Sequence, residues 1–101
     1  MIKRIVKLKI KPEEQEVFKS LFLKSKAIIL SFDCRHVECL QSLDEPSTFF
    51  TYSHWDSVDA LNEYRNSDDF ALIWKNTKAL FADRAQAWST VEVDSIDNLE
   101  K

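Results

Sequence analysis

The sequence predicts an α+β domain whose elements run in the order strand, helix, strand, strand, helix, strand. Its 101 residues suit one domain. Stretches typical of strands and stretches with apolar residues at helical spacing follow one another in that order. A turn signal at 44–47, Asp-Glu-Pro-Ser, separates the two central strand patterns.

The first strand is expected over 2–10 and is followed by an amphipathic helix. One face of this strand is apolar, with Arg4 as the exception; its other members are Ile2, Val6, Leu8 and Ile10. Pro12 stands where a first helical turn tolerates proline, because the missing N–H would be unpaired there anyway. An apolar stripe then recurs at helical spacing: Val17, Phe18, Leu21, Phe22, Ser25, Ile28 and Ile29. We therefore expect this helix to cover one face of a sheet.

The second strand is expected over 33–43, and neither of its faces is purely apolar or purely polar. The odd separation of Cys34 and Cys39 predicts that they point to opposite faces of this strand. A disulfide between them is not expected. Two thiols at this spacing, with only two dispersed histidines, do not match a zinc site, so no metal is predicted.

The stretch from Phe49 to Trp74 organises the chain: a strand, a cap, a helix, a short break and a second helix. After the strand, Asp56 and Ser57 carry side-chain oxygens that can cap a helix. Asn66 and Ser67 interrupt that helix. Asp68 and Asp69 then bring negative charge to the positive end of the next helix.

A fourth strand is expected over 84–94, which gives one domain over 1–94 and a polar tail over 95–101. The resulting βαββαβ order, with its second helix broken, is the ferredoxin-like arrangement. Right-handed crossovers would place the helices on one face of an antiparallel four-stranded sheet. Covering the other face with a second copy would give a homodimer in the form of a dimeric α/β barrel.

Composition excludes several classes of function. A net charge of −3 and a pI near 5.3 disfavour a nucleic-acid partner. No apolar run approaches the ~20 residues that a bilayer needs, and the N-terminus lacks the pattern of a signal peptide, so we expect a cytoplasmic protein without a membrane partner. Glycine is absent, whereas phosphate-binding and dinucleotide-binding loops depend on it.

The pattern F-F-x-Y-x-x-W-x-S, then Y-R-x-S, then D-F-x-x-x-W resembles the antibiotic biosynthesis monooxygenase (ABM) family. Its carriers are Phe49, Phe50, Tyr52, Trp55, Ser57, Leu61, Tyr64, Arg65, Ser67, Phe70 and Trp74. The resemblance covers nearly the whole chain. It implies a homodimer of ferredoxin-like subunits, each with a pocket between sheet and helices. Relatives include quinol monooxygenases that use neither metal nor flavin, haem-degrading proteins, and isomerases of small phosphorylated signals.

The chain departs from the family pattern at three positions. Many relatives carry Glu where this chain has Ser53, and His where it has Tyr64 or Asp69. The Asn–Trp–His set of the haem-degrading branch corresponds to Lys7, Tyr64 and Trp74, so none of the three is kept. Haem degradation is therefore not expected.

A cofactor-free oxygenase needs an ionised substrate, an apolar pocket and a donor that holds the anion. His54 is the first candidate for the base and Tyr64 for the donor, since His titrates near neutral pH. A lone strand histidine is more often structural, and only one face of the strand at 48–55 can meet the helices. The expected substrate-binding residues are Tyr52, Phe70, Trp74 and His36.

Three functions stay open at this point. The chain is a monooxygenase for a quinol or hydroxylated aromatic, a non-catalytic dimeric module that binds a small apolar or aromatic ligand, or a structural or regulatory dimer whose pocket is filled. A pocket that brings His54 or His36 within reach of Tyr64 would favour the first. A pocket blocked by Phe70 and Trp74 would favour the third.

Overall fold

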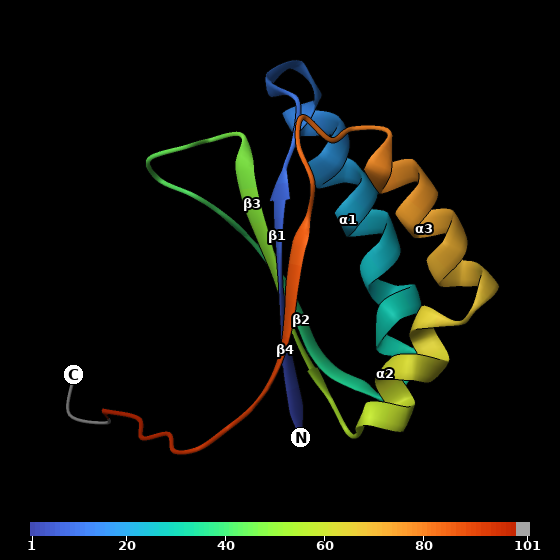
Figure 1. The fold of residues 1–101 in the computed structure, drawn as a ribbon, viewed down its shortest axis with the longest axis vertical. Coiled ribbons are helices and arrows are strands. Elements are labelled where there is room, and N and C mark those ends of the chain that lie inside the picture. Colours follow the sequence, from blue (N-terminus) through green and yellow to red (C-terminus); the bar gives the residue numbers. More distant parts are fainter. Residues whose placement is uncertain (99–101) are drawn as a thin grey trace.

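The fold is a four-stranded antiparallel sheet with helices on one face, as seen in the computed structural model, which describes residues 1–98 (Figure 1). The strands are β1 (Ile2–Lys9), β2 (Cys34–Gln41), β3 (Thr48–Trp55) and β4 (Gln86–Val91). The helices are α1 (Gln15–Leu30), α2 (Val58–Arg65) and α3 (Asp68–Lys78), and a 3-10 turn (Pro12–Glu14) precedes α1. Strand order β2-β3-β1-β4 confirms the predicted ferredoxin-like arrangement.

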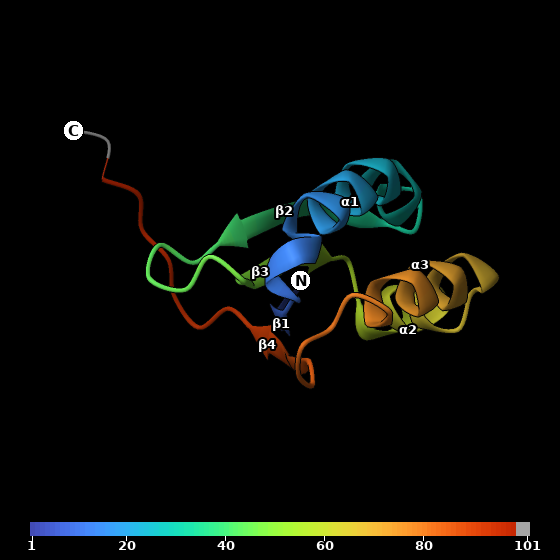
Figure 2. The ribbon, with the colours of Figure 1, turned by 90° about the horizontal axis from the view of Figure 1, so that it is seen from above.

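Helices α1, α2 and α3 cover the same face of the sheet, and none of residues 1–98 forms a helix on the opposite face (Figure 2). The buried side chains form two clusters between sheet and helices. Trp55 and Tyr64 belong to the cluster beneath α2, while Phe49 and Phe18 belong to the one near the start of α1. These clusters leave room for the cavity described below.

Short polar residues set the ends of the helices, as the sequence indicated. Ser57 Oγ accepts the N–H of Ala60 at 3.1 Å and begins α2. Ser67 Oγ accepts the N–H of Phe70 at 3.0 Å and begins α3. The break that these two caps define confirms the predicted division of the second helix.

The second strand is irregular in a way that the sequence pattern does not reveal. The pairing of β2 with β3 shifts between Cys34 and His36, so a bulge at Arg35 interrupts the alternation. Cys34 therefore lies in the core with Trp55, although a regular strand would put it on the face of His36. Cys39 also packs on the helix side, so the prediction that the two cysteines take opposite faces is wrong. Both thiols are free.

Cross-strand partners divide the sheet into two faces. Val6 pairs with Thr51 and Ala87 on the helix-covered face. Ile5 pairs with Tyr52 and Trp88 on the other, which we call the open face. The side-chain direction in β3 thus decides which predicted site residues meet the helices.

The last strand is shorter than the predicted range 84–94 and begins at Gln86. The last strand ends at Val91 and not at Asp94. Residues 95–98 are exposed without regular structure, and residues 99–101 of the predicted tail lie outside the described part of the chain. Within residues 1–98, no helix has the length and apolar character needed to cross a membrane.

Candidate functional site

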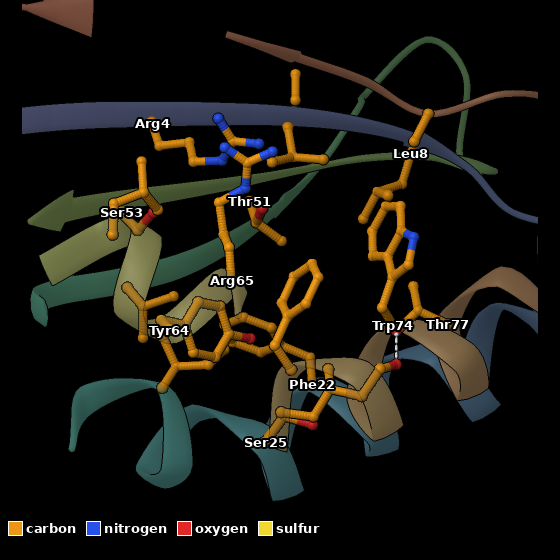
Figure 3. A pocket seen from close by; sticks show the side chains of 18 of the residues that line it. Arg4, Leu8, Phe22, Ser25, Thr51, Ser53, Tyr64, Arg65, Trp74 and Thr77 are labelled. Atoms are coloured by element: carbon orange, nitrogen blue, oxygen red, sulfur yellow. Dashed lines mark hydrogen bonds between the residues drawn. The ribbon is translucent and has the colours of Figure 1, made fainter. Parts of the chain in front are cut away.

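A cavity of about 360 Å³ lies between the helix-covered face of the sheet and the three helices (Figure 3). That volume is in the range of small-molecule sites. All four strands and all three helices contribute to its wall. Its lining is mostly apolar and aromatic, with Val6, Leu8, Phe22, Trp55, Leu61, Tyr64, Phe70 and Trp74 among its members.

Aromatic rings form a continuous series along this cavity. Trp55 stacks on Tyr64 with ring centroids 5.2 Å apart, and Tyr64 meets Phe70 edge-on at 5.1 Å. Phe70 stacks on Trp74 at 5.9 Å with an interplanar angle of 11°. A series of aromatic rings suits a flat aromatic ligand, because stacked and edge-to-face contacts are the favoured contacts between rings. Phe70 and Trp74 are therefore walls of the cavity and do not close it.

Tyr64 brings a hydroxyl group to the wall. Burial raises the pKa of Tyr64 to about 12, with smaller contributions from Cys34 and Asp69. The phenol therefore keeps its proton at neutral pH. Among residues 1–98 its hydroxyl makes no hydrogen bond, which leaves Tyr64 able to donate to an oxygen atom in the cavity.

Two arginines also line the cavity, and the sequence pattern did not identify either as a site residue. Arg4 comes from the middle of β1, and Arg65 ends α2. Figure 3 shows their guanidinium groups pointing toward one another. Arg4 carried a signal, since it interrupts an otherwise apolar strand face. Arg65 is part of the Y-R-x-S pattern, but the end of a short helix looks like ordinary surface in sequence, so the pattern did not indicate that its side chain lines a cavity.

The structure separates the predicted site residues into two groups. Tyr64, Phe70 and Trp74 line the cavity. His54, His36 and Tyr52 do not line it, because their side chains lie on the open face, while Ser53 and Trp55 of the same strand line the cavity. The expectation that His54 and Tyr64 share one site is therefore not met within this chain.

On the open face the three residues form a cluster of their own. The His54 ring lies 5.0 Å from the His36 ring and 4.8 Å from the Tyr52 ring. Burial, followed by the charges of His36 and Lys3, holds the pKa of His54 below its usual 6.5. His54 Nε2 is buried and has no hydrogen-bond partner within residues 1–98. His36 Nε2 contacts Glu38 Oε1 at 2.8 Å.

The chemistry of the cavity follows from its lining. It can hold a flat ring, donate hydrogen bonds and stabilise negative charge. No His, Asp, Glu, Lys or Cys of residues 1–98 lines it, so those residues supply no group that exchanges a proton near neutral pH. The same part of the chain holds no group of three or more His, Cys, Asp or Glu residues that could bind a metal ion.

Solved structures share this fold. The chain matches an antibiotic biosynthesis monooxygenase at 18% identity and a TM-score of 0.85, with 93% of this chain and 100% of that one covered. A conserved protein from Methanosarcina mazei matches at 20% identity and a TM-score of 0.83, with 88% of this chain and 89% of that one covered. A protein from Mycobacterium tuberculosis matches at 16% identity and a TM-score of 0.84, with 95% of this chain and 98% of that one covered.

Sequence comparison is more specific than these structural similarities. No curated protein matches the chain by sequence. The family model described as antibiotic biosynthesis monooxygenase matches residues 1–76, which include β1 to α2 and most of α3. Because this match spans most of the chain and includes the aromatic series, the chain belongs to the antibiotic biosynthesis monooxygenase family.

Proposed function

We propose that this protein is a cofactor-independent monooxygenase that acts on a quinol or hydroxylated aromatic held in the cavity. One observation carries the proposal: in a chain of the ABM family, an open cavity of about 360 Å³ runs along stacked aromatic rings. The rings of Phe70 and Trp74 would lie against the substrate. Tyr64 would donate its hydroxyl proton in a hydrogen bond to a substrate oxygen.

The proposed reaction needs no metal or flavin, because a quinol supplies the electrons itself. One quinol and one O₂ give one hydroxylated quinone and one water. One oxygen atom enters a ring C–H bond, the other leaves as water, and oxidation of quinol to quinone provides the remaining two electrons. The protein's part is to bind the ring, exclude water from it and stabilise its ionised form.

A second candidate is a non-catalytic module that binds a small aromatic molecule in the same cavity. The lining favours it, since none of residues 1–98 places a histidine or carboxylate there. His54, the predicted base, lies on the open face of the sheet and could not reach a substrate held in this cavity. The two candidates share ligand binding and differ in oxygen consumption.

We also propose a homodimer in which the open faces of two sheets pack together. Trp88 and Leu40 on that face are 46% and 48% exposed, and Ile5 lies between Trp88 and Tyr52. A second copy would cover this apolar surface with the same surface, as two-fold interfaces do. The cytoplasm stays the location that the sequence predicts.

Oxygen uptake with 1,4-naphthalenediol distinguishes the two functions. Metal-free protein should consume oxygen above the rate of the diol alone, and Trp74→Ala should lower that rate. Fluorescence quenching by naphthalene without any oxygen uptake would contradict the monooxygenase and favour the binding module. Sedimentation equilibrium of wild type and Trp88→Lys tests the dimer, and a wild-type monomer would contradict it.

A further inference from the structure

Arg4 is a cation set into the wall of a mostly apolar cavity. It is partly buried, and its guanidinium donates a 2.9 Å hydrogen bond to Ser89 Oγ. Ser89 is neutral, and no carboxylate within residues 1–98 forms an ion pair with Arg4. Burial lowers the pKa of Arg4, and the charge of Arg65 lowers it further. The positive charge of Arg4 is therefore not balanced by a carboxylate of residues 1–98, so it is available to pair with an anion in the cavity.

Arg65 brings a second positive charge to the same place. It is exposed at the end of α2, where a cation is favoured by the helix dipole. Its side chain nevertheless lines the cavity and points toward Arg4, as Figure 3 shows. It could have paired with Asp68 or Asp69, but neither forms an ion pair with it. The helix dipole explains the residue type and does not explain this direction.

Two guanidinium groups that face one another repel, and an oxyanion between them is attracted to both. Guanidinium groups match planar oxyanions particularly well, because their N–H donors lie in one plane. The partly buried position of Arg4 strengthens this attraction relative to water. Ser53 and Thr51 line the same end of the cavity and add hydroxyl groups.

The cavity is therefore polarised along its length. Figure 3 shows Arg4 and Arg65 at one end, and Trp74 with Leu8 at the other. We propose that the ligand is an aromatic anion, whose flat ring lies toward Trp74 and whose ionised oxygen lies between Arg4 and Arg65. This inference rests on the proposed function and narrows its substrate class to hydroxylated or carboxylated aromatic molecules that bind in the ionised form.

The arginine pair would also account for a cavity without a general base. Stabilising the phenolate of a bound phenol or quinol favours release of its proton to water. An opposite charge within a few ångströms typically shifts the pKa of an acid by about 1 to 3 units. Arg4 and Arg65 would thus promote ionisation of the substrate without accepting its proton.

The test follows the ionisation of 2-naphthol by its absorption spectrum in the presence of excess protein. Wild type should lower the apparent pKa of bound 2-naphthol by about one unit or more. Arg4→Gln should remove most of this shift and Arg65→Gln part of it, since Arg65 is exposed. Arg84→Gln removes the same charge from a side chain that does not line the cavity, and it should keep the wild-type shift.

Two further probes separate the sources of negative charge. Naphthalene tests the ring site alone, and its affinity should stay within about twofold in all variants. Binding of 2-naphthoate tests a carboxylate, and it should weaken at least tenfold in Arg4→Gln. Circular dichroism checks the fold, and Arg65→Gln serves as the second variant because its backbone is at the surface.

The outcomes are distinguishable. If naphthalene binds but neither 2-naphthoate affinity nor 2-naphthol ionisation depends on the two arginines, the result contradicts an anion site between Arg4 and Arg65. It still supports binding of an aromatic ring in the cavity. If 2-naphthoate depends on them and 2-naphthol ionisation does not, the anion is a carboxylate. If no probe binds and no oxygen is consumed, the proposed function falls, and this inference falls with it.

Discussion

The indole Nε1 of Trp55 donates a buried 2.9 Å hydrogen bond to Ser53 Oγ, two residues earlier on the same face of β3. Trp55 is only 2% exposed, and its ring stacks on Tyr64 in the wall of the cavity. Ser53 also lines the cavity. Its hydroxyl group therefore holds the indole of Trp55 in place in the cavity wall.

Ser53→Ala should lower the free energy of unfolding by about 1 to 3 kcal/mol, because the buried indole N–H would lose its partner. Urea denaturation measures the change. Ser20→Ala, at an exposed position of α1 without a side-chain hydrogen bond in the described chain, is the matched control and should stay within about 0.5 kcal/mol of wild type. In a Trp55→Phe background the Ser53 substitution should cost much less, and an equal cost in both backgrounds would contradict the role of the bond.

The faces of the strands show how far sequence reasoning extends. Alternation in β1 predicted its apolar face and marked Arg4 as the exception, and both are confirmed. Alternation in β3 could not say which of its two faces meets the helices, because aromatic side chains occupy both. Because of that ambiguity, the sequence could not show that His54 and Tyr64, which were predicted to share one site, lie on opposite sides of the sheet.

Features that depend on three-dimensional neighbours were not predictable in the same way. The bulge at Arg35 inserts a residue without any glycine or proline to signal it, and it carries Cys34 into the core. Arg35 itself forms a bidentate ion pair with Asp56, which is distant in sequence. Arg4 and Arg65 likewise come from β1 and from the end of α2, and only the fold brings them to the same end of the cavity. Patterns along the chain describe faces, and contacts between elements require the fold.

Stability should fall as the pH drops below about 6.5 because of His54. Its pKa is lowered in the folded chain, so the unfolded state binds more protons between the two pKa values. The contribution is fully present above 6.5 and is lost as the pH falls through the folded-state pKa. Around His54, Lys3 and His36 oppose its protonation, while Glu38 and Glu92 favour it. Urea midpoints at pH 7.5 and pH 5 measure the effect.

His54→Asn should flatten this pH dependence, because the substituted side chain does not titrate. The comparison is repeated in the Trp88→Lys background so that dissociation of a dimer is not mistaken for unfolding. A pH dependence that is unchanged in His54→Asn would assign the effect to other groups.

Both cysteines should resist alkylation in the folded protein. Burial raises the pKa of Cys39 to about 11 and also raises the pKa of Cys34, which is in the core. At pH 8 about a thousandth of the Cys39 thiol is then ionised, and the thiolate is the reactive form. Iodoacetamide labelling followed by mass spectrometry should show slow reaction in buffer and complete reaction in 6 M guanidinium. Fast labelling of the folded chain would contradict the burial of Cys34 and the partial burial of Cys39.

Removing the cap of α3 should loosen the aromatic wall of the cavity. Ser67→Ala takes away the acceptor of the Phe70 N–H and should cost about 1 kcal/mol of stability. Because α3 carries Phe70 and Trp74, amide hydrogen exchange should rise in its first turn, while the amides of β1 and β3 stay protected.

Ser67→Asp is the variant that should restore the protection, since aspartate is also a good cap and its charge suits a helix N-terminus. Ser57→Ala removes the equivalent cap of α2 and should raise exchange in that helix, with Ser57→Asp restoring it. If Ser67→Ala and Ser57→Ala both loosen α3 to the same extent, the two helices open as one unit. That result would contradict the independent role of the break at Asn66 and Ser67, which divides the cavity wall into the part that holds Tyr64 and the part that holds Phe70 and Trp74.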